Sequence, residues 1–80
     1  METTKTVIVY STPSCPYCQY TKQFFSQNNV AFEDVNVAID PLRAREMVQK
    51  SGQMGVPVID IDGQIVVGFN PEAFSELLGQ

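Results

Sequence analysis

Two cysteines separated by two residues are the part of this sequence most able to do chemistry. Cys15 and Cys18 enclose Pro16 and Tyr17, and the chain contains no other cysteine. At the start of a helix, a spacing of three residues brings two sulfur atoms onto one side of the first turn. Such a pair exchanges electrons with disulfides, because one thiolate attacks the disulfide and the second thiol resolves the mixed disulfide. The spacing therefore predicts a redox-active dithiol.

The position of each cysteine predicts its role. Cys15 lies at the expected helix start, where unpaired N–H groups and the helix dipole favour a thiolate. Cys18 lies one turn further in and is expected to be more buried. Cys15 is therefore the expected nucleophile and Cys18 the resolving cysteine. The chain has no histidine, which excludes a Cys-His pair and leaves the helix start as the leading means of activating Cys15.

Three other interpretations of the pair stay open at this point. A structural disulfide is rare in a reducing compartment. The N-terminal residues 1–6 are polar and lack the features of a secretory signal, so we expect a cytoplasmic protein. Half of a zinc site is a second alternative, although zinc takes four ligands and this chain offers two thiols and no imidazole. A zinc ion or iron–sulfur cluster held between two chains through Cys15 is the third.

The elements that must position these cysteines alternate between strands and helices. Apolar runs predict strands at 5–10, 31–37, 56–61 and 65–67. Prolines favoured at the first helical position predict helices that begin at Pro16, Pro41 and Pro71. The order is β-α-β-α-β-β-α, in which a helical crossover makes the first two strands parallel and Asp62-Gly63 predicts an antiparallel hairpin. We therefore expect one α/β domain over residues 1–80, with a mixed four-stranded sheet flanked by three helices.

The spacing of apolar residues predicts which face of each helix is buried. The three predicted stripes are Tyr17, Thr21, Phe24 and Phe25; Ala44, Met47, Val48 and Ser51; and Phe74, Leu77 and Leu78. Asn28 and Asn29 should end the first helix, and Gly52 the second.

Two further segments are candidates for binding a substrate. In Gly55-Val56-Pro57-Val58 the proline is either an ordinary strand-entry residue or a cis proline facing the cysteines. In the second case the backbone of Val56 would pair with an extended substrate. The segment from Gly68 to Pro71 predicts a helix cap or a wall of the substrate site. Candidate wall residues are Thr12, Tyr17, Gly68, Phe69 and Asn70. Tyr17, between the cysteines, is expected to be exposed and to shape this surface, and the alternative is an ordinary half-buried aromatic on the helix.

Composition excludes two classes of partner. The chain has 5 Lys and Arg against 9 Asp and Glu, a net charge of −4. It therefore lacks a basic patch for nucleic acid. Its apolar runs are too short to span a membrane. We expect a monomer with no nucleic-acid or membrane partner.

At these residues the sequence resembles the glutaredoxins over nearly its whole length. Cys15-Pro16-Tyr17-Cys18 matches the dithiol motif of that family, and Val56-Pro57 matches its Thr-Val-Pro segment with Gly55 in place of threonine. Gly68 falls where the family has a Gly-Gly element. The resemblance implies a thioredoxin-like fold and a cis bond before Pro57. It also implies disulfides or glutathione mixed disulfides as substrates, glutathione as reductant and no tightly bound cofactor.

The segment that begins at Gly68 resembles a second group. Gly68-Phe69-Asn70-Pro71-Glu72 is similar to the Ser-Gly-Phe-Arg-Pro-Asp stretch of the redoxins that donate hydrogen to ribonucleotide reductase. Those proteins are recharged by thioredoxin reductase. Thr12 also stands where glutaredoxins often carry a lysine. We therefore predict a glutaredoxin-like thiol–disulfide oxidoreductase whose electron donor is either glutathione or thioredoxin reductase, with ribonucleotide reductase as one candidate partner.

Overall fold

The computed structural model describes residues 6–79 of the chain. Strands and helices follow one another in the predicted order, β-α-β-α-β-β-α. They are β1 (Val7–Ser11), α1 (Pro16–Gln27), β2 (Glu33–Asn36), α2 (Pro41–Ser51), β3 (Val58–Ile61), β4 (Gln64–Val67) and α3 (Pro71–Leu78). None of the helices within these residues is long and apolar enough to cross a membrane.

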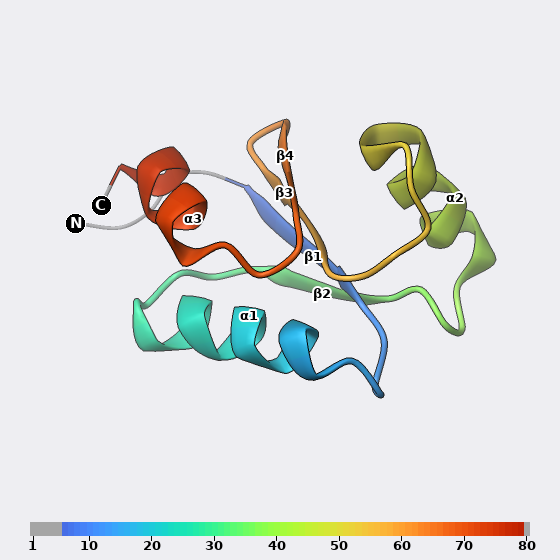
Figure 1. The fold of residues 1–80 in the computed structure, drawn as a ribbon, viewed down its shortest axis with the longest axis horizontal. Coiled ribbons are helices and arrows are strands. Elements are labelled where there is room, and N and C mark those ends of the chain that lie inside the picture. Colours follow the sequence, from blue (N-terminus) through green and yellow to red (C-terminus); the bar gives the residue numbers. More distant parts are fainter. Residues whose placement is uncertain (1–5, 80) are drawn as a thin grey trace.

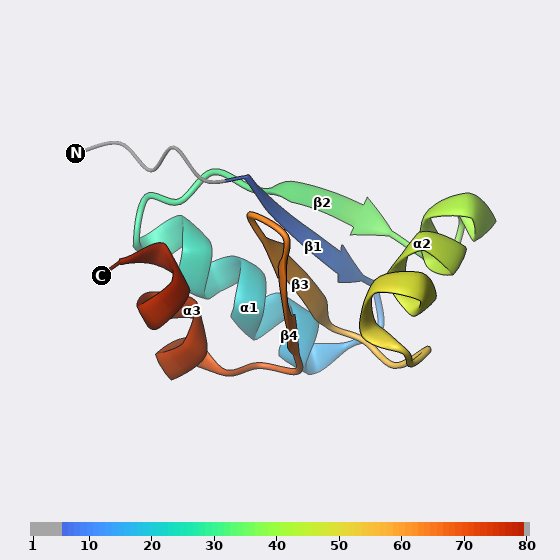
Figure 2. The ribbon, with the colours of Figure 1, turned by 90° about the horizontal axis from the view of Figure 1, so that it is seen from above.

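The four strands form one mixed sheet in the order β2-β1-β3-β4. β1 and β2 run parallel, and the other two pairs are antiparallel. Figure 1 shows α1 on one side of this sheet and α2 on the other, and Figure 2 shows α3 beside α1. This is the predicted thioredoxin-like architecture.

Alternation along the central strand β1 divides the core between the two faces of the sheet. Val7 and Val9 pack with Phe25 of α1 and Phe74 of α3 in one cluster. Tyr10 packs with residues of the α2 side in the other cluster. β1 is buried on both faces because it lies between two strands and two helical layers, as its continuous apolar run predicted.

The predicted helix starts and turns are confirmed. Asp40 caps α2 by accepting a hydrogen bond from the Arg43 N–H at 3.1 Å, and Asn70 caps α3 in the same way. In the hairpin between β3 and β4, Asp62 and Gly63 have φ values of 54° and 91°. Two consecutive positive φ values are typical of the turn that Asp-Gly favours between antiparallel strands.

Some boundaries differ from the prediction. β3 begins at Val58, two residues later than expected, because Pro57 has no N–H to donate to a ladder. β2 is an edge strand of four residues and is shorter than predicted. β1 continues through Ser11, whereas the predicted strand residue Lys5 lies outside the described residues.

The first turn of α1 decides between the two positions expected for Tyr17. Its side chain is 61% exposed, as expected for a wall of the site, so Tyr17 does not share the buried side of the stripe on which its spacing placed it. The buried residues of α1 are Cys18, Thr21 and Phe25. These residues recur at the three- and four-residue spacing of a helix, so Cys18 takes the buried side of the first turn and turns Tyr17 outward.

Candidate active site

The two cysteines lie at the start of α1, just after the loop that connects it to β1. Cys15 is the N-cap of α1, in an extended conformation, and Pro16 occupies the first helical position. The Cys15 N–H donates to the carbonyl of Thr12 at 3.3 Å, which fixes the turn between strand and helix. The Cys18 N–H donates to the Sγ of Cys15 at 3.1 Å. Both thiols are free, so the geometry is that of the reduced dithiol.

The two thiols have different environments. Cys15 keeps 9% of its surface exposed, whereas Cys18 is completely buried. Burial, followed by a side-chain hydrogen bond with Cys15, raises the pKa of Cys18 to about 12. The positive charge of Lys22 opposes this only weakly, and its ammonium group is paired with Asp34 at 3.2 Å. Cys18 is therefore protonated at neutral pH in the reduced protein.

The segment that contains Pro57 approaches the same end of the sheet. Val58 pairs with Tyr10, so continuing this antiparallel register places Val56 level with Thr12. Figures 1 and 2 both show the start of α1 and the segment leading into β3 at this end. The Val56–Pro57 bond is cis, as the family resemblance implied. Among residues 6–79, neither the N–H nor the C=O of Val56 has a hydrogen-bond partner.

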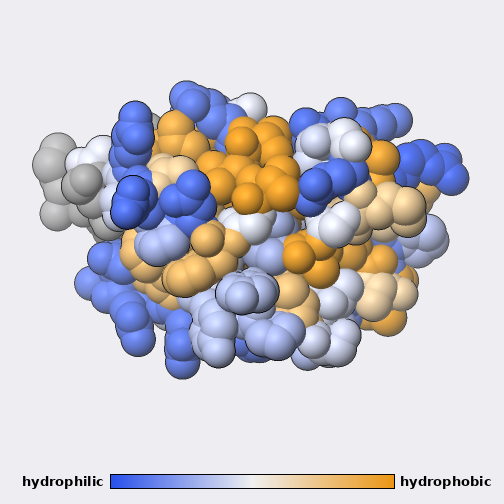
Figure 3. Space-filling view, viewed as in Figure 1, coloured by the Kyte–Doolittle hydropathy of each residue, from blue (hydrophilic) through white to orange (hydrophobic). Residues whose placement is uncertain are grey.

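The segment after β4 closes the site from the α1 side. The Gly68 N–H donates to the carbonyl of Pro57 at 2.9 Å. The ring of Phe69 lies 6.0 Å from that of Tyr20, which in turn lies 5.9 Å from the ring of Tyr17. These three exposed or half-exposed aromatics form a continuous surface beside the first turn of α1. Figure 3 shows that apolar side chains also gather over β4, where Val67 is exposed.

The structure thus brings most of the predicted site residues to one end of the sheet. Asn70 is a different case, because its side-chain oxygen accepts the Ala73 N–H at 3.2 Å and serves α3 as its cap. Tyr20 was not singled out from the sequence, although it lies three residues from Tyr17 and the two therefore share a helix face.

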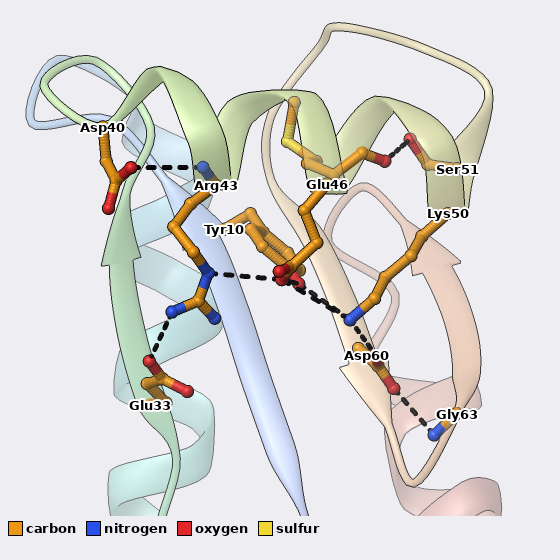
Figure 4. A network of polar contacts seen from close by, with 10 residues as sticks. Tyr10, Glu33, Asp40, Arg43, Glu46, Lys50, Ser51, Asp60 and Gly63 are labelled. Atoms are coloured by element: carbon orange, nitrogen blue, oxygen red, sulfur yellow. Dashed lines mark hydrogen bonds and ion pairs between the residues drawn. The ribbon is translucent and has the colours of Figure 1, made fainter.

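A polar network on the opposite face of the sheet was also not predicted. The buried hydroxyl of Tyr10 donates to the carboxylate of Glu46 and accepts from the ammonium of Lys50, as Figure 4 shows. Lys50 also donates to Asp60 at 2.7 Å. Arg43 bonds both Glu46 and Glu33. Charged residues from α2 thereby fasten it to three strands, a long-range arrangement for which the sequence pattern gives no signal.

The described part of the chain contains no preformed cluster of metal ligands that would support a zinc site within one chain. Among residues 6–79 there is no group of three or more His, Cys, Asp or Glu residues that could hold a metal ion. Metal analysis and absorbance of the purified protein test for a centre shared by two chains through Cys15.

Comparison with known proteins gives consistent matches. The glutaredoxin family model matches residues 7–66. An uncharacterised glutaredoxin-like 8.6 kDa protein in the rubredoxin operon of Clostridium pasteurianum is 50% identical over 70 residues, covering 88% of this chain and 93% of that protein. The glutaredoxin-like protein NrdH of Lactococcus lactis is 34% identical over 74 residues, covering 89% and 97% of the two chains. The crystal structure of a glutaredoxin from Archaeoglobus fulgidus superposes with a TM-score of 0.86 at 26% identity, covering 96% of this chain and 89% of that one.

Proposed function

Because this chain belongs to the glutaredoxin family and is a glutaredoxin-like thiol–disulfide oxidoreductase, we propose that Cys15 is its nucleophile and Cys18 its resolving cysteine. The observation that carries this proposal is the hydrogen bond from the Cys18 N–H to the Sγ of Cys15. A backbone donor at a helix N-terminus stabilises a sulfur anion. Cys15 is also the cysteine that retains some solvent exposure.

The proposed reaction transfers two electrons to the substrate. The Cys15 thiolate attacks one sulfur of a substrate disulfide, the substrate S–S bond breaks, and the second substrate sulfur leaves as a thiolate. Cys18 then gives its proton to that departing thiolate. The Cys18 thiolate attacks the Sγ of Cys15, forms the Cys15–Cys18 disulfide and releases the remaining substrate sulfur, which takes up a proton from water.

The reduced state keeps Cys18 inactive until it is needed. Its raised pKa has burial as the first cause, followed by the hydrogen bond with Cys15, while the negative charge of Cys15 contributes further. When Cys15 becomes part of a mixed disulfide, its negative charge disappears and its sulfur becomes a poorer acceptor. Two causes of the raised pKa are then removed, so attack by Cys15 itself favours ionisation of Cys18.

We assign the surrounding residues to substrate binding. The unpaired backbone of Val56 would form hydrogen bonds with an extended substrate segment, next to the buried Pro57. Tyr17, Gly68 and Phe69 would line the other side, with Thr12 at the base of the site. Disulfide-containing proteins and glutathione mixed disulfides are the substrate classes that fit this arrangement.

Glutathione is one candidate for the electron donor. A second candidate, thioredoxin reductase, is favoured by two observations. Pro71 occupies the first position of α3 and offers no N–H to an anion. Moreover, Thr12 stands where glutaredoxins often carry a lysine, so this position offers no cation to a carboxylate of glutathione. Measuring NADPH oxidation with glutathione and glutathione reductase, and separately with thioredoxin reductase alone, distinguishes the two donors.

A stoichiometric assay tests the dithiol proposal without any assumption about the donor. Pre-reduced protein is mixed with bis(2-hydroxyethyl) disulfide, and its mass and free thiols are then measured. We expect each chain to lose two hydrogen atoms and both thiols, and peptide mapping to find a Cys15–Cys18 disulfide. Persistent free thiols after exposure to excess disulfide would refute the proposal.

A further inference from the structure

An apolar groove lies against α2, outside the proposed dithiol site. It has a volume of about 540 Å³, and its lining includes Val37, Ile39, Ala44, Val48 and Met54. Ile39 and Met54 are exposed over 79% and 81% of their surfaces. Large apolar side chains exposed this far around a concave surface are typical of a binding site. In Figure 3 apolar side chains gather at the right of the molecule, where α2 and the segment leading to β3 lie.

The two sides of α2 contact different parts of the molecule: one faces the sheet and the other lines the groove. Arg43, Glu46 and Lys50 point toward the sheet and belong to the polar network of Figure 4. Ala44 and Val48, one turn apart, line the groove on another side of the helix. The network therefore fixes α2 in place without filling the groove, which stays open to a partner.

The groove also carries a free positive charge. Arg45 lines it and has no ion-pair partner among residues 6–79. The other described cations, Lys22, Arg43 and Lys50, are each paired with carboxylates. In a protein with a net charge of −4, this unpaired guanidinium beside an apolar surface is complementary to a carboxylate on an apolar segment.

The groove adjoins the proposed active site at the end of the sheet where β1 and β2 finish. Val37, part of its lining, donates its N–H to the carbonyl of Ser11 at 3.0 Å, directly before Thr12. At its other side Met54 lies two residues before Val56. A polypeptide that pairs with the Val56 backbone can therefore extend into the groove.

We propose that this groove binds an apolar segment of the protein whose disulfide reacts with Cys15, and that a carboxylate of that segment pairs with Arg45. This inference rests on the proposed function and makes its substrate class a protein disulfide flanked by apolar and acidic residues. Because it extends past the reacting sulfur, the groove distinguishes protein substrates from small disulfides.

The test uses two peptides of equal length, each with one cysteine as a mixed disulfide with 2-mercaptoethanol. Both carry the same leucine-rich flank, which ends in glutamate in one peptide and in lysine in the other. The rate at which pre-reduced protein reduces each peptide is compared with its rate on bis(2-hydroxyethyl) disulfide. We expect the glutamate peptide to react about fivefold faster than the lysine peptide, which is the effect of one ion pair. The overall negative charge of the protein would favour the lysine peptide instead, so long-range attraction cannot produce this result.

Matched variants test whether the preference for the glutamate peptide depends on the groove. Arg45→Gln removes one positive charge from the groove and should abolish the preference for the glutamate peptide. Gln27→Glu changes the net charge by the same amount at an exposed position in the last turn of α1, away from the groove lining, and should retain the preference. Ile39→Ser should slow both peptides by about threefold relative to the small disulfide.

Each outcome has one meaning. An equal preference in wild type and Arg45→Gln would overturn the groove proposal, while continued reduction of the small disulfide would leave the proposed function intact. Failure of wild type to reduce even the small disulfide would overturn the proposed function itself. A dimer in sedimentation that Ile39→Ser dissociates would show that a second copy covers the groove, and would also overturn the proposal.

Discussion

The backbone N–H of Cys18 points at the Sγ of Cys15 across 3.1 Å. This relationship follows from the three-residue spacing, because a residue at the N-cap of a helix accepts from an N–H two or three positions later. Here a sulfur takes the place usually held by an oxygen. The first turn of α1 therefore both positions Cys15 and supplies a donor for its anionic form.

The contrast between the two thiols predicts an order of alkylation. With its pKa raised to about 12, chiefly by burial, Cys18 is present almost entirely as the thiol at pH 7. We expect limiting iodoacetamide at pH 7 to modify Cys15 and leave Cys18 unmodified. Peptide mapping measures this, and the unfolded protein in urea is the control in which both should react. Equal labelling of the two cysteines in the folded protein would contradict the account.

The interactions of Glu46 predict that the free energy of unfolding falls in acid. The hydrogen bond from Tyr10 is the first cause that lowers the pKa of Glu46. A carboxyl with a lowered pKa in the folded state stabilises that state above its unfolded pKa of about 4.3, and this contribution disappears as the pH falls through the folded value. We expect Glu46→Gln to cost about 0.5–1 kcal/mol at pH 7, a modest figure because the carboxyl is partly exposed.

Urea denaturation across pH measures this contribution. The difference between wild type and Glu46→Gln should shrink as the pH falls below about 4. Glu76→Gln, at an exposed position of α3, changes the same charge and should have little effect. A cost that stays constant down to pH 2 would show that Glu46 acts through packing instead.

The aromatic core predicts a large effect from Phe74 and a small one from its neighbour. Phe74 is completely buried between Phe25, with ring centroids 5.0 Å apart, and Phe24. Phe74→Ala should cost about 3–5 kcal/mol in the free energy of unfolding. Phe69→Ala, in contact with Phe74 but 36% exposed, should cost about 1 kcal/mol. Similar costs for the two in urea denaturation would refute this account of the core.

Local sequence signals predicted most of the fold. Asp40-Pro41, Asn70-Pro71 and Asp62-Gly63 each determine a cap or a turn through their own chemistry. These signals determine the order of strands and helices. Because a helix connects β1 to β2, these two strands run parallel, and the hairpin between β3 and β4 makes the sheet mixed. The catalytic candidates followed because Cys15 and Cys18 lie within one turn of a recognisable helix start.

Features that depend on contacts between distant residues were not predicted. The network around Tyr10 joins residues up to 40 positions apart, and no local pattern marks such pairs. The groove beside α2 likewise forms only when the segments containing Val37 and Met54 are brought together.

The measurement that tests the central claim most directly is the intact mass of Cys18→Ser after reaction with a glutathione mixed disulfide of a peptide. The account predicts one stable adduct on Cys15, since no second thiol remains to resolve it. Cys15→Ser should form no adduct and reduce no substrate. An adduct on Cys18 in wild type, or full activity in Cys15→Ser, would contradict the assignment of Cys15 as the nucleophile.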